Sequence, residues 1–290
     1  MLTIEARAKI NLTLDITGLR PDGFHAITTI MQTIGLSDTV ELTKAPDAIA
    51  LDIADNPDVP AGEQNLAWQA AQLLRENYLS PTDGVSIKLT KRIPMGAGLA
   101  GGSTDAAAVL AGMDRLYGLR LSPEELCRVG AELGSDIPFC LRGGTMLATG
   151  RGEILTELPP LPHTYVVLAK PNFAVSTPWA YREYDRLGTK FHPDNPAMQK
   201  CLAAGDREGA AKLLGNALEI PVAAKYPEIK RLKQIMLAAG ALGALMSGSG
   251  STVFALTENK MRAEAVASAL SAENVTVFVT ETYNKEFEVR

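Results

Sequence analysis

A glycine-rich loop followed at once by a helix constrains this chain more than any other feature. Four glycines between positions 96 and 102 remove side chains from the loop, so that backbone N–H groups can converge on an anion. Ser103, Thr104 and Asp105 are good N-cap residues, and apolar residues at helical spacing continue to Tyr117. A helix start presents unpaired N–H donors and a positive dipole end. The loop therefore predicts a phosphate-binding site.

Three interpretations of the loop compete. A Walker A loop ends in Gly-Lys-Ser/Thr, but Gly102 is followed directly by Ser103, which excludes that motif. The Gly-x-Gly-x-x-Gly spacing that begins at Gly96 satisfies the dinucleotide-binding fingerprint, and residues 85–89 before it alternate like a strand. However, a second helix opens at 122–125 where a Rossmann unit needs a strand, which argues against NAD. A glycine-rich turn without a ligand stays open, although phosphate binding explains the glycines better.

Composition limits the classes of partner. A chain of 290 residues suits one large or two modest domains. The net charge of −5 and the pI near 5.4 argue against nucleic acid as a partner, while leaving room for a locally basic pocket. No apolar run approaches the ~20 residues of a membrane-spanning helix, and no signal peptide is apparent, so we expect a cytoplasmic protein. Scattered cysteines and histidines favour buried reduced thiols over a zinc site.

The first half of the chain is predicted to mix strands and helices. Every even position from Leu2 to Ile16 is apolar, which predicts a long strand with one buried face. Further strands are expected near 27–35, 38–44, 85–91 and 145–149, and helices near 64–77, 104–117 and 122–132. The proline-rich segment 159–162 is the expected domain boundary, because prolines end regular structure.

The second half predicts a different arrangement. Strands are expected at 164–169, 242–246, 252–256 and 275–282, and helices near 178–187, 196–203, 206–217, 227–239 and 260–272. Without the extra helices, this half has the order β-α-β-β-α-β, which is the split βαβ or ferredoxin-like pattern.

Polar residues outside the loop are candidates for chemistry, although each has an ordinary structural alternative. Lys9 and Asn11 share the polar face of the first strand, which a purely solvated face would also explain. Asp136 lies just after a helix in a Gly-Ser-Asp-x-Pro turn, where Asp commonly forms an Asx turn.

Aromatic residues and a second glycine-rich segment form a weaker group of candidates. Phe24 and His25 follow a Pro-Asp-Gly turn and would ordinarily be a packed aromatic and a surface histidine. Tyr181 would ordinarily be a core residue, and Ser247–Ser251 would be a flexible hairpin loop. The joint presence of all these residues is what requires an explanation.

Together these segments resemble the GHMP small-molecule kinases. The signature of that family is a Pro-x-Gly-x-Gly-Leu-x-(Gly/Ser)-Ser-type loop, which corresponds to Pro94–Thr104 here. The other matching segments follow the family's order over nearly the whole chain: Ala8–Leu12, Arg20–His25, Asn65–Ala67, Gly134–Phe139 and Ser247–Ser251. The chain departs from the family at Phe24, where Tyr is more frequent, and at Ala100 and Thr104, where Gly and Ser are common.

The resemblance implies an α+β fold of two domains. Residues 1–158 would form an N-terminal domain similar to ribosomal protein S5, and residues 159–290 a ferredoxin-like C-terminal domain. It also implies an ATP-dependent kinase whose Mg²⁺ bridges the ATP phosphates with few protein ligands. The residues expected to bind the nucleotide are Pro94, Met95, Gly96, Ala97, Gly98, Leu99, Ala100, Gly101, Gly102, Ser103 and Thr104, with Asn65 near the adenine.

The resemblance also assigns roles around the transferred phosphoryl group. Lys9 and Asp136 would be the catalytic pair. The matches at 8–12 and 20–25 point to a family member whose small-molecule substrate carries a cytidine diphosphate group. Asn11 and His25 would then contact that substrate, and its cytosine would stack between two aromatic rings, which here are those of Phe24 and Tyr181. No dedicated metal ligand, membrane or nucleic-acid partner is implied.

Two alternatives remain open. Another GHMP kinase, acting on homoserine, mevalonate or a sugar, would keep the glycine loop but would not need Phe24, His25 or an aromatic residue at Tyr181. A catalytically inactive nucleotide-binding module on the same fold would not need the pair formed by Lys9 and Asp136. The sequence leaves the oligomeric state undetermined.

Overall fold

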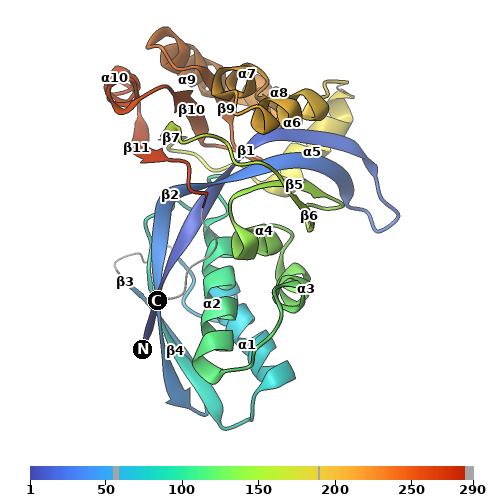
Figure 1. The fold of residues 1–290 in the computed structure, drawn as a ribbon, viewed down its shortest axis with the longest axis vertical. Helices are drawn as coiled ribbons and strands as arrows, with labels where there is room; N and C mark the ends of the chain where they lie inside the picture. The colour runs from blue at the N-terminus through green and yellow to red at the C-terminus, as the bar shows by residue number, and fades with distance from the viewer. Residues whose placement is uncertain (55–58, 189, 285–290) are drawn as a thin grey trace.

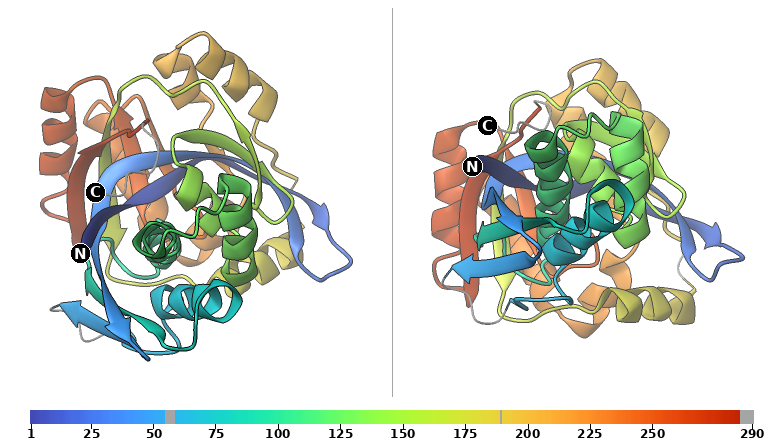
Figure 2. Two further views of the ribbon diagram at one scale, coloured as in Figure 1. Left: turned by 60° about the horizontal axis from the view of Figure 1, so that its bottom comes forward. Right: turned by 90° about the horizontal axis from the view of Figure 1, so that it is seen from below.

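The computed structural model describes residues 1–54, 59–188 and 190–284, which form two β-sheets covered by helices (Figure 1). The N-terminal sheet has the strand order β3-β4-β2-β1-β8, with β5 beside β2 and β6 beside β5. Its strands are β1 (Leu2–Leu19), β2 (His25–Pro46), β3 (Ile49–Ala54), β4 (Asp83–Thr90), β5 (Thr145–Thr149), β6 (Ile154–Glu157) and β8 (Gly215–Asn216). Helices α1 (Leu66–Tyr78), α2 (Gly101–Tyr117), α3 (Pro123–Leu133) and α4 (Ile137–Arg142) gather on one side of this sheet (Figure 2).

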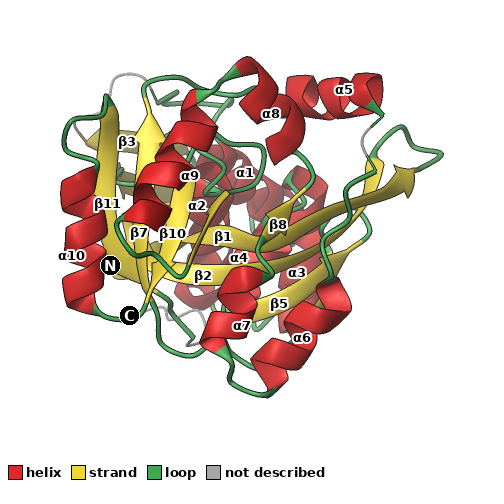
Figure 3. Cartoon of the chain, turned by 90° about the horizontal axis from the view of Figure 1, so that it is seen from above, coloured by secondary structure: helices red, strands yellow, loops and turns green. Residues whose placement is uncertain are grey.

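The C-terminal sheet has the ferredoxin-like order that the sequence predicts. Its strands β7 (Tyr165–Pro171), β9 (Gly243–Met246), β10 (Val253–Thr257) and β11 (Val275–Glu281) run antiparallel in the order β11-β7-β10-β9. Helices α9 (Glu228–Ala238) and α10 (Lys260–Ala269) pack on this sheet, on the side away from β1 and β2 (Figure 3). The remaining helices are α5 (Thr177–Leu187), α6 (Asn195–Ala203), α7 (Arg207–Lys212) and α8 (Glu219–Lys225).

Strand β1 contributes to more than one hydrophobic core. Ile4 packs with the helices of the N-terminal part, whereas Ile10 lies in a core between the two sheets, together with Phe254 of β10. The pairing of β1 with β2 shifts its register between Arg7 and Lys9, and such irregularities bend a strand. The bend lets one strand serve both parts of the molecule.

The predicted strand over 2–16 is confirmed, but its single buried face is wrong. The side chains of Lys9, Asn11 and Thr13 are buried as fully as the apolar residues between them. The alternative of a solvated polar face is therefore also wrong. Helices of the N-terminal part cover one face of β1, and the C-terminal sheet covers the other.

Most other predicted elements are confirmed, with a few corrections. The segments 27–35 and 38–44 form one continuous strand, β2. The helix predicted over 206–217 ends at Lys212, and residues 215–216 pair with β1 as the short strand β8. Strands β3 and β6 and helices α4 and α8 were not predicted. The division at 158/159 stays a prediction.

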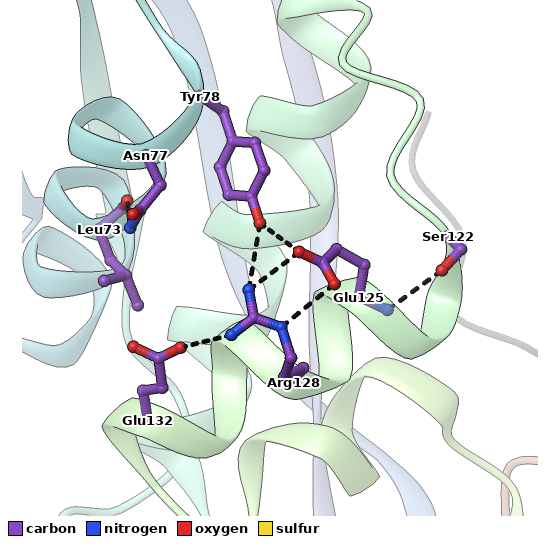
Figure 4. Close-up of polar contacts among 7 residues, drawn as sticks. All are labelled: Leu73, Asn77, Tyr78, Ser122, Glu125, Arg128 and Glu132. Atoms are coloured by element: carbon purple, nitrogen blue, oxygen red, sulfur yellow. Dashed lines mark hydrogen bonds and ion pairs between the residues drawn. The ribbon is translucent and has the colours of Figure 1, made fainter.

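A polar network on the surface joins α1 to α3 (Figure 4). The Arg128 guanidinium donates to Glu125, pairs with Glu132, and lies 3.4 Å from the Tyr78 hydroxyl, which itself donates to Glu125. The N–H of Glu125 donates to Ser122, the N-cap of α3.

Within the described ranges, no helix is both long and apolar enough to cross a membrane.

Candidate active site

A cleft of about 1010 Å³ lies between the N-terminal and C-terminal parts of the molecule. One wall is the glycine loop with the start of α2, and another contains residues 175–182 and 248–250. The cleft brings together almost all residues that the sequence singles out. They are Lys9, Asn11, Phe24, His25, Asn65, residues 94–103, Asp136 and Tyr181.

The glycine loop leads into α2 without a side-chain cap. Ala100 is the N-cap, in the left-handed conformation at φ 60°, and makes no capping hydrogen bond. The prediction that Ser103, Thr104 or Asp105 caps this helix is therefore wrong, because the helix begins at Gly101 and all three residues lie inside it. The N–H groups of a first helical turn have no intrahelical acceptor. They stay available to an anion in the cleft.

Thr104 is the one residue of the predicted nucleotide loop that does not line the cleft. Its side chain is buried, and its hydroxyl has no hydrogen-bond partner among the described residues. The next residue, Asp105, does line the cleft. The side chain at 104 thus faces the protein interior rather than the nucleotide.

A buried ionic cluster anchors both ends of the loop. Lys91, at the end of β4, pairs with Asp38 of β2 and lies 2.6 Å from Asp105 of α2. Asp38 also accepts the backbone N–H groups of Arg92 and Ile93. Burial raises the pKa of Asp105 well above its usual range, against the opposing charge of Lys91. The cluster ties β2, β4 and α2 together at the loop.

Sequence reasoning missed this cluster. Asp38 is an acidic residue in the middle of a strand, where Asp is rare, and this is the signal that was available. Asp38 lies 53 residues before Lys91, which lies 14 residues before Asp105, so that only the fold reveals the cluster.

Lys9 and Asp136 face each other across the cleft. The Lys9 Nζ atom lies 3.7 Å from Asp136 Oδ2, with the lysine side chain 5% exposed and the aspartate 39% exposed. Lys9 also donates to Asn11 Oδ1 at 2.8 Å and to the carbonyl of Gly98 at 3.2 Å. A buried ammonium requires such partners. They fix its direction toward Asp136.

Asp136 does not act as a local cap. It occupies the N-cap position of α4, yet its side chain makes no capping hydrogen bond. The Asx-turn alternative is therefore not supported, and the carboxylate is left free to face the cleft and Lys9. Asn11, in contrast, forms hydrogen bonds through both ends of its amide, because its Nδ2 also donates to the Thr29 hydroxyl, and its predicted contact with the substrate stays a prediction.

The aromatic candidates also line the cleft. The rings of His25 and Tyr181 stack with centroids 4.8 Å apart, and His25 Nε2 lies 2.8 Å from Asp185, which sequence reasoning missed. Phe24 is 54% exposed and lies near the Arg151 guanidinium rather than against Tyr181. A cytosine between the rings of Phe24 and Tyr181 stays a prediction.

Tyr181 also interacts electrostatically with Asp136. Burial, and then the negative charge of Asp136, raise the pKa of the Tyr181 hydroxyl above its ordinary value. The tyrosine therefore stays neutral, and its hydroxyl lies within the electrostatic reach of Asp136.

Asn65 lines the cleft but has a structural task. Its Oδ1 accepts the N–H of Ala67 as the N-cap of α1, and its Nδ2 donates to the carbonyl of Pro60. A contact with adenine stays a prediction, and such a contact would share an amide that is already in use.

The second glycine-rich segment is packed rather than flexible. Ser247 and Ser251 are fully buried, and the Ser247 hydroxyl donates to the carbonyl of Gly98 at 2.9 Å. The N–H of Thr252 donates to the carbonyl of Ala97 at 3.2 Å. This segment from the C-terminal part therefore braces the nucleotide loop of the N-terminal part.

No group of three or more His, Cys, Asp or Glu side chains that could hold a metal ion is found in the described part of the chain. The three cysteines are free, but of the predicted buried thiols only Cys140 is buried, whereas Cys127 and Cys201 are partly exposed. The burial of Cys140 raises the pKa of its thiol, so this residue stays protonated. The site is thus a cleft that contains the Lys9–Asp136 pair and the N-terminus of α2.

Two family models match the chain. The GHMP kinases N terminal domain matches residues 65–144, and the GHMP kinases C terminal model matches residues 198–276. The first match contains the glycine loop and Asp136, and the second contains the bracing segment at 247–251. The chain therefore belongs to the GHMP kinases, which are ATP-dependent phosphotransferases.

Individual relatives narrow the assignment. A 4-diphosphocytidyl-2-C-methyl-D-erythritol kinase from Geobacillus kaustophilus is 47% identical over 270 residues, which cover 93% of this chain and 92% of the relative. A crystal structure of 4-(cytidine 5'-diphospho)-2C-methyl-D-erythritol kinase has a TM-score of 0.81 at 36% identity, covering 98% of this chain and 100% of that one. Within the GHMP kinases, the chain belongs to the family of 4-diphosphocytidyl-2-C-methyl-D-erythritol kinases.

The alternative within the superfamily has weaker support. The crystal structure of homoserine kinase from Cytophaga hutchinsonii has a TM-score of 0.78 at 20% identity, covering 100% of this chain and 96% of that one. This likeness concerns the fold, which GHMP kinases of different substrates share. The predicted two-part fold, with its ferredoxin-like C-terminal sheet, is confirmed.

Proposed function

We propose that this chain transfers the γ-phosphoryl group of ATP to the 2-hydroxyl of 4-diphosphocytidyl-2-C-methyl-D-erythritol, a step toward isoprenoid precursors by the non-mevalonate pathway. The observation that carries the proposal is the Lys9–Asp136 pair, 3.7 Å apart, in a cleft that also contains an uncapped helix N-terminus. Phosphoryl transfer depends mainly on positioning and charge stabilisation, and this arrangement supplies both.

The catalytic pair divides the work. Asp136 accepts the proton of the attacking hydroxyl, since its carboxylate is free of capping bonds and half-exposed to the cleft. Lys9 stabilises the ionised form of Asp136 and neutralises charge on the transferring phosphoryl group. Asn11 and the Gly98 carbonyl hold the ammonium in place, so that no reorganisation is needed during the reaction.

The nucleotide phosphates would bind at the start of α2. The N–H groups of Gly101, Gly102 and Ser103 belong to its first turn, where the helix dipole favours negative charge. Ion pairs of Lys91 with Asp38 and Asp105 keep this turn in place before ATP arrives. Preorganised donors stabilise charge without an ordering cost at the moment of reaction.

The residues present fit a Mg²⁺ ion that arrives with ATP. Asp105 lines the cleft, and its Oδ1 is buried without a hydrogen-bond partner in the described part of the chain. Mg²⁺ is usually held by one or two carboxylates together with substrate phosphates and waters. In its ionised form, which a nearby cation favours against the effect of burial, Asp105 would hold the ion, directly or through water, and the ion would neutralise charge on the phosphates.

The cytidine end of the substrate would occupy the far part of the cleft. His25 is oriented by Asp185 and stacks on Tyr181, so its ring is fixed for a polar contact with a base. Phe24 lacks the hydroxyl of a tyrosine but presents an exposed ring face for stacking.

We also propose the domain division at 158/159, and a cytoplasmic location stays a prediction.

The test is single-turnover phosphoryl transfer from ATP to the cytidylyl substrate and to methylerythritol without the cytidylyl group. We expect turnover of the first substrate only. Asp136→Asn should bind ATP and melt like the wild type, yet lower turnover by about 10²–10⁴-fold. Near-normal chemistry in this variant would remove Asp136 from the mechanism, and equal turnover of both substrates would contradict cytidylyl recognition.

A further inference from the structure

A short segment at 215–219, which sequence analysis left without a role, lies against the bracing loop. Residues 215–216 form β8, which pairs in parallel with β1 at Thr13 and Leu14, and the N–H of Ala217 donates to the carbonyl of Leu14 at 2.9 Å. The segment is therefore attached to β1, the strand that carries Lys9, at a point that begins four positions after Lys9.

The side-chain amide of Asn216 forms hydrogen bonds with backbone groups through both its nitrogen and its oxygen. Its Nδ2 donates to the carbonyls of Met246 and Gly248, both at 2.8 Å, and its Oδ1 accepts the N–H of Leu218 at 2.9 Å. The side chain is buried and does not line the cleft. Its two donors thus fix the bracing loop on both sides of Ser247.

Glu219 also forms a hydrogen bond with the backbone of the same loop. Its Oε2 accepts the N–H of Met246 at 2.8 Å, and its Oε1 pairs with Lys233 of α9. Asn216 and Glu219 therefore satisfy both the carbonyl and the N–H of Met246, from one turn of chain. Such a double contact defines the position of the loop backbone closely.

The loop held in this way lies close to Lys9 and to the Gly98 carbonyl. A Cβ atom built on Gly248 would lie 3.1 Å from the Gly98 carbonyl oxygen and 3.4 Å from Lys9 Nζ. The Gly98 oxygen accepts from both Ser247 and Lys9. A displacement of residues 246–248 would therefore change the acceptor that aims the Lys9 ammonium.

We propose that Asn216, assisted by Glu219, is a positioning residue for Lys9, acting through the backbone of residues 246–248 and the carbonyl of Gly98. The proposal rests on the role of Lys9 in the proposed function. A displacement of about 1 Å at a catalytic group can cost about 10²-fold in rate. We expect Asn216 variants to lower kcat by about that factor and to leave the substrate KM nearly unchanged.

The decisive substitution is Asn216→Asp, measured alone and together with Lys9→Met. Aspartate keeps the shape and the acceptor for Leu218, but it loses both donors to the loop. If Asn216 acts through Lys9, the substitution should cost far less in the Lys9→Met background than in the wild type, because residues that act as a unit are not additive. An equal factor in both backgrounds would overturn the proposal.

A matched control separates positioning from loss of stability. Asn259→Ala removes the N-cap of α10, where Asn259 Oδ1 likewise accepts one backbone N–H, but it leaves the bracing loop untouched. It should lower the melting temperature without changing kcat. If Asn216→Asp does not fold, Glu219→Ala replaces it, since alanine removes the acceptor of the Met246 N–H and leaves the Asn216 side chain in place.

Hydrogen exchange gives a readout that does not depend on turnover. In the Asn216 variant, amides of peptides covering 94–102 and 246–250 should exchange faster than in the wild type and in Asn259→Ala. Unchanged exchange there, with unchanged kcat, would refute the positioning role. A wild-type protein that does not phosphorylate the cytidylyl substrate would refute the proposed function instead, and the exchange data would still decide the position of the loop.

Discussion

Gly98→Ala is the substitution whose effect the structure defines most closely. Gly98 has φ +75°, and a Cβ atom at this position would lie 2.1 Å from the carbonyl oxygen of Ser247. Ordinary contacts begin at 3.4 Å, so the two loops would have to separate by about 1.3 Å. The obstacle is backbone, which cannot move aside as a flexible side chain would. The nucleotide loop would therefore lose its brace.

The expected cost has two components. A non-glycine residue in the left-handed region costs about 1–2 kcal/mol, and overpacking a buried site costs about 1–3 kcal/mol. Their sum is roughly 2–5 kcal/mol, which, at an unfolding entropy of about 0.6 kcal/mol/K for a chain of this size, lowers the melting temperature by roughly 3–8 °C. Since the carbonyl of Gly98 also accepts from Lys9, kcat should fall as well.

Gly102→Ala provides the control four residues away. Its Cβ would meet only Leu66 Cδ1 at 3.5 Å, an ordinary contact, and the position is helical. Replacing a helical glycine by alanine should stabilise the protein by about 0.5–1 kcal/mol. Thermal unfolding by calorimetry should therefore show shifts of opposite sign. Equal shifts, or a stable Gly98→Ala protein with wild-type kcat, would refute the packing of the two loops described here.

Two further predictions concern the substrate and acid stability. Phe24→Ala or Tyr181→Ala should weaken cytidylyl substrate binding by ~1–3 kcal/mol, about 5- to 150-fold by calorimetry, while ATP affinity stays unchanged; weakened ATP binding instead would contradict the placement. Hydrogen bonds with Arg128 and Tyr78 lower the pKa of Glu125 from 4.5 to about 2. The ionised Glu125 stabilises the fold above pH 4.5, and this contribution is lost as pH falls toward 2. The melting temperature of Glu125→Gln should therefore fall less than that of the wild type between pH 4.5 and 2.

The patterns that could be predicted from the sequence are local. Glycines before an alanine-rich helix predict the phosphate loop. The order of expected strands and helices in the second half predicts the ferredoxin-like pattern. Each of these elements is recognised from residues that are neighbours in the sequence. A family resemblance added Lys9 and Asp136, which lie 127 positions apart, although each has an ordinary structural alternative when considered alone. The structure then shows that these two residues face each other.

What the sequence did not predict depends on distant contacts. Residues 215–216 resemble the end of a helix, and only pairing with β1 makes them a strand. Lys91 and Asp38 look like surface charges until three elements bury them together. Ala100 departs from the family's usual glycine, and its φ of 60° shows why glycine is common there. In each case tertiary packing overrides local preference.

The burial of Lys9 links catalysis to the assembly of the whole molecule. An isolated buried ammonium is very costly, and its cost is offset only when Asn11, the Gly98 carbonyl and Asp136 are all in place. Asn11 belongs to β1 itself, but Asp136 comes from the turn before α4, and the position of Gly98 depends on Ser247 in the other half of the chain. The Lys9 ammonium is therefore stable in this position only after the N-terminal sheet, which contains β1, has packed against the C-terminal sheet. We therefore expect a variant with a loosened contact between the two sheets to lose phosphoryl transfer while α2, at whose start the phosphates would bind, is still folded.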